Sequence, residues 1–195
     1  QPKLSDSSRP DRMSALPVVA VVGRPNVGKS TLVNRIIGSR SAVVESQPGV
    51  TRDRRQFDAD WAGRDFILVD TGGWEAKPGD PLDASIRSQA EAALTGADVI
   101  VFVLAATTDI GEDDRGVAGI LKRGTAPVVV AANKVDNPGL ELDAARLWSL
   151  GLGEPIPVSA FHGRGVGDLL DRIVAEFPDA VDREEVEGPP RLAIV

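Results

Sequence analysis

Residues 18–30, which read VVAVVGRPNVGKS, decide the fold of this chain. The first five are apolar and mostly β-branched, which predicts a buried strand that ends at Gly23. Residues 23–30 match the pattern G-x-x-x-x-G-K-[ST] and lead into a helix predicted over about 29–37. In that context, backbone N–H groups and the positive end of the helix can bind phosphate. The alternative is a plain glycine-rich turn with a surface lysine, which the flanking strand and helix disfavour.

This phosphate loop, residues 23–30, supplies the first candidate site residues. Lys29 is expected to reach the terminal phosphates of a nucleotide, and the Ser30 hydroxyl is expected to bind Mg²⁺. The candidate nucleotide-binding residues of this stretch are Gly23, Arg24, Pro25, Asn26, Val27, Gly28, Lys29, Ser30 and Thr31.

Outward from this loop, strand and helix patterns alternate along the chain. Apolar strands are predicted at 66–69, 99–104, 128–132 and 156–158, an edge strand at 57–61, and helices at 83–94, 113–123, 140–150 and 166–177. Continuously apolar strands between helices are typical of a mostly parallel sheet covered by helices on both faces, so we predict an α/β fold. Ligands of such sheets bind beyond the carboxyl ends of the strands. Functional residues are therefore expected in the loops that follow the strands.

The sequence Asp70-Thr71-Gly72-Gly73 follows the predicted strand at 66–69. The Asp70 carboxylate is expected to face Lys29 and to hold Mg²⁺ directly or through water. The Gly73 N–H could contact a terminal phosphate. Taken alone, a polar turn in which the aspartate bonds its own backbone explains the motif equally well. The phosphate loop earlier in the chain favours the functional interpretation.

Asn133-Lys134-Val135-Asp136 follows the predicted strand at 128–132 and indicates a guanine site. A carboxylate at Asp136 can accept the N1–H and 2-amino groups of guanine, whereas adenine has an acceptor at N1 and no 2-amino group. The Lys134 stem can lie over the base, and Asn133 is expected to tie this loop to the phosphate loop. A capped turn before the next proline is the alternative.

Two further loops carry weaker signals. Ser159-Ala160 could donate backbone N–H groups to the guanine oxygen, although a plain loop into the last helix would look the same. The segment 48–53 contains Thr51, which is expected to bind Mg²⁺ when a γ-phosphate is present. The arginines around it are interpreted as solvated charges. His162 is expected to be an exposed loop residue.

In this order the loops resemble the first G domain of the bacterial double-Era-like GTPases (Der, also called EngA), over about 17–177. The stretches that carry the resemblance are 23–35, 48–54, 70–73, 159–160 and 163–165. It implies a P-loop GTPase that binds GTP and GDP with Mg²⁺ and acts in maturation of the large ribosomal subunit. That family has two G domains in tandem and then a KH-like domain. We therefore expect a disordered arm at 1–16, a G domain at 17–177, an acidic linker at 178–190 and, at 191–195, the first strand of a truncated second G domain.

Composition narrows the function classes. The 195 residues carry 22 Lys and Arg against 29 Asp and Glu, and this net charge of −7 disfavours bulk nucleic-acid binding. Without cysteine there can be no disulfide or thiolate metal site, which fits a reducing compartment, and we expect a cytoplasmic location. The longest apolar run, 99–106, is too short to cross a bilayer.

The catalytic device follows from the resemblance. Trp74 stands where Ras-type enzymes have a glutamine that orients water. Related GTPases with an asparagine in the phosphate loop use K⁺ in place of an arginine finger, and Asn26 matches that position. We expect Asn26, the nucleotide phosphates and the backbone carbonyls of 46–49 to hold K⁺, and the alternative is that Asn26 only bonds backbone groups of its own loop. The candidate catalytic residues are Lys29, Asn26, Thr51 and Gly73. The alternative function is a guanine-nucleotide-sensing module that does not hydrolyse GTP, and the motif at 133–136 disfavours a third alternative, an ATP-dependent P-loop kinase.

Overall fold

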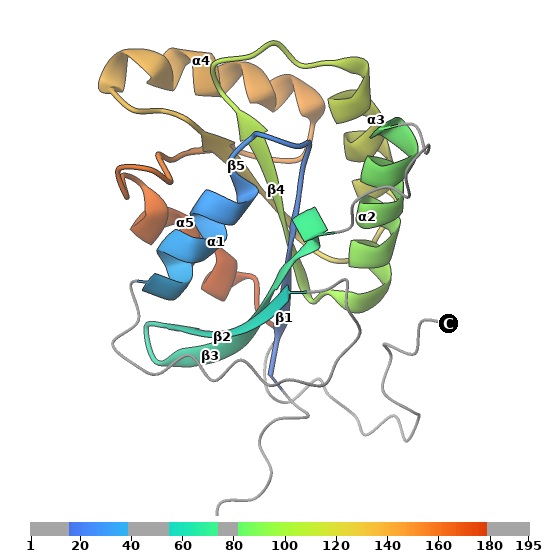
Figure 1. Cartoon of the computed structure of the whole chain (residues 1–195), viewed down its shortest axis with the longest axis vertical. Helices are drawn as coiled ribbons and strands as arrows, with labels where there is room; N and C mark the ends of the chain where they lie inside the picture. Colours follow the sequence, from blue (N-terminus) through green and yellow to red (C-terminus); the bar gives the residue numbers. More distant parts are fainter. Residues whose placement is uncertain (1–15, 39–54, 74–81, 179–195) are drawn as a thin grey trace, which may run out of the picture.

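The computed structural model describes residues 16–38, 55–73 and 82–178, and these contain one six-stranded sheet (Figure 1). Its strand order is β2-β3-β1-β4-β5-β6. The strands are β1 (Val18–Val22), β2 (Arg55–Trp61), β3 (Arg64–Asp70), β4 (Val99–Ala105), β5 (Val128–Asn133) and β6 (Ile156–Pro157). β2 pairs antiparallel with β3, and all other neighbours pair in parallel. The predicted mostly parallel sheet with an edge strand near 57–61 is confirmed.

Helices connect these strands. They are α1 (Lys29–Gly38), α2 (Leu82–Gly96), α3 (Glu112–Leu121), α4 (Glu141–Ala145) and α5 (Val166–Ala175), with short 3₁₀ helices η2 (Thr71–Gly73), η3 (Pro138–Leu140) and η4 (Arg146–Leu150). No helix within the described ranges is both long and apolar enough to cross a membrane.

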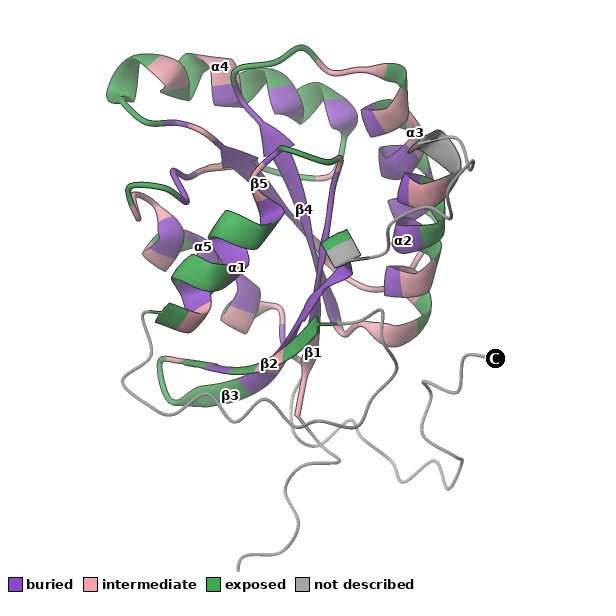
Figure 2. Cartoon of the chain, viewed as in Figure 1, coloured by how far each residue is buried: buried purple, intermediate pink, exposed green. Residues whose placement is uncertain are grey.

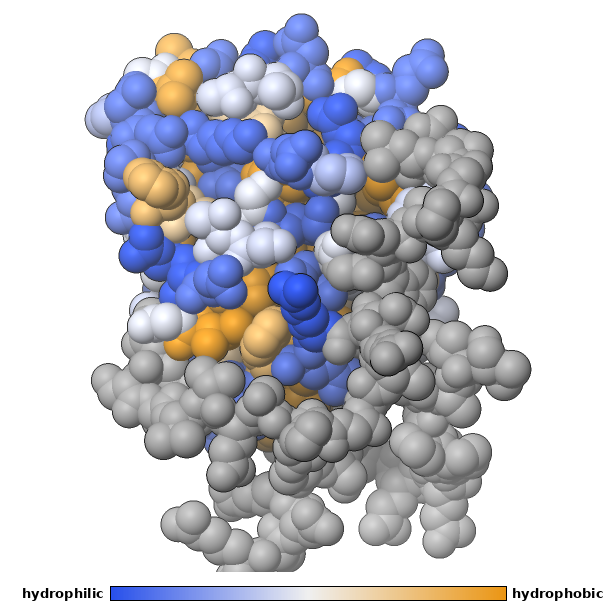
Figure 3. Space-filling view, in the orientation of Figure 1, coloured by the Kyte–Doolittle hydropathy of each residue, from blue (hydrophilic) through white to orange (hydrophobic). Residues whose placement is uncertain are grey.

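The strands separate two apolar cores, as the alternation of side chains along a strand requires (Figure 2). Val19 and Val21 of β1 pack in the core covered by α1 and α5. Ala20 and Val22 of the same strand pack in the core covered by α2, α3 and the α4 segment. β1, β4 and β5 are thus buried on both faces, which is why they read as continuous apolar runs. The edge strand β2 is mostly exposed. The described surface on the face shown in Figure 3 is mostly hydrophilic, with apolar residues in small groups.

The predicted helices differ from the structure in their bounds. α1 and α2 end at Gly38 and Gly96, beyond the predicted 37 and 94. α3 and α5 each end two residues early, because their last residues make tighter bonds, such as Arg123 N–H to the Ile120 carbonyl (3.1 Å) and Phe177 N–H to the Val174 carbonyl (3.2 Å). The helix predicted at 140–150 is only α4 in its middle, flanked by η3 and η4. It ends as predicted at Gly151, which has a φ of +66°.

Trp61 and Trp148 lie in different surroundings. Trp61 packs against the core of α1 and α5, and its indole N–H donates to Asp171 (2.7 Å). Trp148 lies on η4 and is 53% exposed, so it is no core residue. Most of the expected arm at 1–16 and linker at 178–190, and all of 191–195, lie outside the described residues.

The connections around β1 open the sheet at its carboxyl end. The chain leaves β1 for α1 on one face of the sheet, whereas it leaves the neighbouring strands β3 and β4 for α2 and α3 on the other face (Figure 1). Such a divergence of connections leaves a crevice at the strand ends where ligands bind in open α/β sheets. The loops after β1, β3, β5 and β6 therefore meet at one edge of the sheet.

Candidate functional site

Lys29 begins α1 and lies inside the phosphate loop. Its ammonium Nζ donates to the carbonyls of Gly23 (2.6 Å) and Arg24 (2.8 Å), and only 7% of the residue is exposed. Burial lowers the pKa of Lys29 below its ordinary value, and the nearby Asp70 carboxylate opposes that shift. A buried ammonium at a helix N-terminus is suited to an anion, because the backbone N–H groups there add to its charge.

Asp70 ends β3 beside this lysine, as predicted. Its Oδ2 lies 3.3 Å from the Ser30 hydroxyl, and its Oδ1 accepts the Gly72 N–H at 2.8 Å. The carboxylate is 3% exposed, so both of its oxygens are held in place. The hydroxyl and the carboxylate together present hard oxygen donors, which is the chemistry that Mg²⁺ prefers.

Thr71 anchors the next position of the same motif. Its hydroxyl donates to the Val21 carbonyl (2.6 Å) and lies 3.3 Å from Oε1 of Gln89 on α2. Both Thr71 and Gln89 are buried. The segment that follows β3 is therefore tied to β1 and to α2, and Gly73 ends η2 next to it.

Two glycines of the phosphate loop cannot be replaced without a clash. A Cβ at Gly23 would lie 2.4 Å from the Val103 carbonyl oxygen, and one at Gly28 would lie 2.2 Å from the Asn133 side-chain nitrogen. Gly28 also has a φ of +98°, which L side chains rarely adopt. The sequence pattern thus reflects close contact of this loop with β4 and β5.

The backbone and the side chain of Arg24 contact different parts of the structure. Its carbonyl faces Lys29, whereas its guanidinium pairs with Asp114 of α3 (Nε to Oδ1, 2.8 Å). Asp114 is 1% exposed, and its other oxygen accepts the Gly111 N–H at 2.9 Å. This ion pair connects the phosphate loop to α3. The contact could not be predicted from the sequence around either residue.

Asn133, at the end of β5, joins two loops through one side chain. Its amide nitrogen donates to the Val27 carbonyl (2.8 Å), and its amide oxygen accepts the Ala160 N–H (2.9 Å). The residue is 3% exposed. The prediction that Asn133 ties its loop to the phosphate loop is confirmed, and the structure adds the loop after β6 to that connection.

The predicted base-recognition residues lie together beyond β5 and β6. The Ser159 hydroxyl donates to the carboxylate of Asp136 (2.7 Å), and Asp136 is exposed. Lys134, which precedes Asp136 in the same motif, is half-buried and has a φ of +68°. The N–H groups of Ser159 and Ala160 already donate to the Arg164 carbonyl and to Asn133, both at 2.9 Å. A guanine oxygen would have to share these donors, so their predicted role stays a prediction.

Other predicted residues are accounted for as follows. Asn26 lies exposed at the tip of the phosphate loop with a φ of +64°. His162 is exposed, as predicted, and its ring packs edge-on against Phe161. Thr51, the segment 48–53 and Trp74 lie outside the described residues.

The fold and this arrangement define a P-loop GTPase domain. Residues 18–134 match the family model described as 50S ribosome-binding GTPase, and the chain belongs to that family. The chain is 57% identical to GTPase Der of Streptomyces coelicolor over 185 residues, which cover 92% of this chain and 39% of that protein. It is 56% identical to GTPase Der of Salinispora tropica, over 92% of this chain and 38% of that protein. The chain thus spans about two fifths of the length of these relatives.

Solved structures show the same fold. Era in complex with MgGDPNP and a segment of 16S ribosomal RNA superimposes with a TM-score of 0.64 at 30% identity, over 84% of this chain and 57% of that one. The G domain of the Thermotoga maritima FeoB iron transporter gives a TM-score of 0.57 at 24% identity, over 83% and 98%. The second likeness concerns the fold alone.

Proposed function

We propose that this chain binds guanine nucleotides at the carboxyl end of its sheet and hydrolyses GTP to GDP and phosphate. The observation that carries the proposal is the pair of hydrogen bonds made by the Asn133 side chain. They connect Val27 of the phosphate loop with Ala160 of the loop after β6. The phosphate-binding and base-binding candidates therefore belong to one site. The family assignment and the relatives named GTPase Der support the same reaction.

In this proposal the phosphate end is built from Lys29, Ser30 and Asp70. Lys29 binds the β- and γ-phosphates, and the Ser30 and Asp70 oxygens, 3.3 Å apart, are proposed to hold Mg²⁺. Thr51, which lies outside the described residues, is proposed as a further ligand. Bound Mg²⁺ would neutralise part of the negative charge on the phosphate oxygens. The N–H of Gly73 is proposed to donate to the γ-phosphate. Lys29→Ala is expected to abolish nucleotide binding, and tight binding by this variant would contradict the assignment.

At the base end, Asp136 is proposed to accept the N1–H and 2-amino groups of guanine while Ser159 fixes the carboxylate. Asp136→Asn should weaken GTP binding and shift the preference toward xanthosine nucleotides, which competition against fluorescent GDP would measure. Asp143→Asn, on α4, is the matched control. Unaltered GTP affinity in Asp136→Asn would show that the guanine assignment is wrong.

Asn26 is proposed to contribute its amide oxygen to a bound K⁺. Its exposed position in the phosphate loop leaves this oxygen accessible, and an oxygen ligand suits an alkali cation. The cation would supply positive charge near the β- and γ-phosphates, in place of an arginine. The other part of this proposed site, the backbone of 46–49, lies outside the described residues.

A guanine-nucleotide-sensing module without turnover is the second candidate function. Trp74 favours it, because an indole cannot orient the attacking water as a glutamine does. Steady-state GTP hydrolysis with Mg²⁺, in K⁺ and in Na⁺ at equal ionic strength, separates the two. Faster turnover in K⁺ that is lost in Asn26→Ala and kept in the control Asn137→Ala supports the cation-assisted GTPase. Tight GTP binding without turnover in either salt supports the sensing module.

The cellular role we propose is maturation of the large ribosomal subunit in the cytoplasm, carried out by a longer protein that includes a second G domain and a KH-like domain. The family description and the names of the relatives support this. Because this chain carries a net charge of −7, we expect it to bind ribosomal RNA weakly alone. Co-sedimentation with 50S subunits, loaded with a GTP analogue or GDP, tests the proposal on the longer protein and on this chain in parallel.

A further inference from the structure

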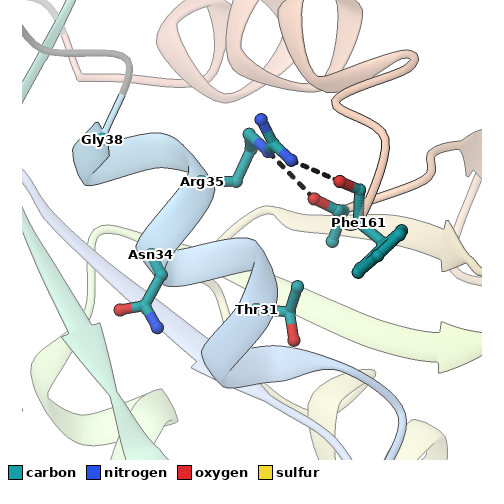
Figure 4. A pocket seen from close by; sticks show the side chains of 6 residues that line it. Thr31, Asn34, Arg35, Gly38 and Phe161 are labelled. Carbon is teal, nitrogen blue, oxygen red and sulfur yellow. Dashed lines mark hydrogen bonds between the residues drawn. The ribbon is translucent and has the colours of Figure 1, made fainter.

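Arg35 projects from α1 toward the loop that follows β6 (Figure 4). We call residues 159–165 the guanine loop. The Arg35 Nε donates to the Ala160 carbonyl (3.0 Å), and its Nη2 donates to the next carbonyl, that of Phe161. One planar guanidinium thus bonds two consecutive peptide units of a loop that lies 125 residues away in sequence.

The guanine loop is folded on itself before it meets Arg35. The Gly163 N–H donates to the Ser159 carbonyl (2.7 Å), and the Ser159 N–H donates to the Arg164 carbonyl (2.9 Å). The His162 N–H donates to the Ser159 hydroxyl at 3.1 Å. These bonds set the shape of the loop, and its position relative to α1 depends on other contacts.

Ala160 receives those contacts on both of its polar groups. Its N–H donates to Asn133, and its carbonyl accepts from Arg35. Because Asn133 also bonds the phosphate loop, this peptide unit is held between β5 and α1, the helix that begins with Lys29. Between α1 and the loop lies a hollow of about 420 Å³, lined by Thr31, Asn34, Arg35, Gly38, Ala160 and Phe161 (Figure 4).

The fork geometry explains why an arginine does this. A guanidinium presents two donors at a fixed spacing, whereas a lysine ammonium is a point charge on a flexible stem. Arg35 is exposed, so its bonds are made at the surface and add little to the apolar core. Their main effect is to fix where the 160–161 peptide units stand relative to Asp136 and the phosphate loop.

We propose that Arg35 is a positioning residue that sets how tightly and how selectively the site holds the guanine base. It acts through the Ala160 and Phe161 carbonyls and does not touch the nucleotide phosphates. This inference rests on the proposed function, since it concerns the same site.

The test compares GDP and ADP binding to the full 195-residue chain, by competition against fluorescent GDP. Arg35→Ala should weaken GDP binding and speed GDP release about tenfold, the scale of lost charge-assisted hydrogen bonds. ADP binding depends on the phosphate loop, so the GDP-to-ADP affinity ratio should fall by the same factor. Arg35→Lys should restore part of the ratio, because one donor at a time replaces two.

Arg172→Ala is the matched control, since it removes an exposed arginine of α5 that pairs only at the surface with Glu176 (2.9 Å). It should leave the ratio unchanged. If Arg35→Ala lowers the melting temperature and keeps the wild-type ratio, or weakens both nucleotides equally, the inference is wrong. If Arg35→Ala does not fold, Arg35→Lys decides the question by the same ratio. A wild-type chain that binds no GDP would instead refute the proposed function.

Discussion

Asn133 is the residue on which the site depends most directly. Its amide satisfies the Val27 carbonyl and the Ala160 N–H in the interior. Asn133→Ala should lower the free energy of unfolding by about 2–4 kcal/mol, because both of those buried groups lose their partner. GDP binding should weaken in parallel. Urea denaturation and fluorescent-nucleotide titration measure the two effects.

Asn137→Ala provides the comparison for that variant. Asn137 is exposed and accepts one N–H, from Gly139 at 3.0 Å, where it caps η3. Losing this cap should cost about 1 kcal/mol or less and leave GDP binding intact. If Asn133→Ala and Asn137→Ala lost equal amounts of unfolding free energy and GDP affinity, the hydrogen bonds of Asn133 between the loops would not be important for the site.

Lys29 should give the stability of the chain a pH dependence in alkaline solution. Burial lowers its pKa in the folded state below the ordinary 10.5, against the opposing effect of Asp70. Between that lowered pKa and 10.5 the unfolded chain binds more protons, so folding becomes more favourable as pH rises. The free energy of unfolding of the wild type, relative to Lys29→Met, should therefore increase from neutral pH toward 10.5. A flat or falling difference in urea denaturation would contradict this.

At the scale of elements, the phosphate loop tolerates no side chain where it meets β5. Gly28→Ala places a Cβ 2.2 Å from the Asn133 nitrogen, on backbone with a φ of +98°. We expect a loss of at least about 2 kcal/mol in unfolding free energy together with the loss of GDP binding. Thermal melting and nucleotide titration measure these.

Gly119→Ala is the control for this substitution. Gly119 lies in α3, and nothing stands within 4 Å of the position of its Cβ. In a helix, alanine is favoured over glycine by about 0.5–1 kcal/mol, so this variant should melt slightly higher than the wild type. If Gly28→Ala and Gly119→Ala had the same melting temperature, the predicted clash at Gly28 would not destabilise the chain.

The elements could be predicted from sequence because their signals are local. Continuous apolar runs identified β1, β3, β4 and β5, and the first two of these runs end at Gly23 and Asp70. Glycine marked the ends of helices. Helix ends were less predictable. Gly124 placed the end of α3 too late, and the apolar Phe177 extended the predicted α5, because in both helices the last turn is tighter than an α-helical turn.

The site divides in the same way. Lys29, Ser30 and Asp70 could be brought together from topology alone, because parallel strands end at one edge of the sheet. The Arg24–Asp114 ion pair and the Arg35 bonds to the guanine loop could not. These contacts join residues far apart in sequence, and no sequence motif at either residue predicts its partner.

For the whole molecule, nucleotide should act as a stabiliser, because its site is assembled from segments that only the folded chain brings together. GDP at about one hundred times its dissociation constant should add about 2.7 kcal/mol to the unfolding free energy. For a chain of this size that corresponds to a rise of about 5–10 °C in melting temperature. ADP at the same concentration should give a much smaller rise, and an equal rise would contradict selective guanine binding.

The long reach of the Asn133 and Arg35 bonds also determines when the site can form. The Asn133 bond to Val27 spans 106 residues, and the Arg35 bond to Ala160 spans 125. Contacts so distant along the chain carry a large loop-closure entropy and form slowly. During synthesis, the phosphate loop emerges early, but the base end is missing until β6 and the guanine loop have left the ribosome. Guanine recognition is thus acquired late in folding, and a nascent chain that stops before residue 159 has nothing with which to tell GTP from ATP beyond Asp136 alone.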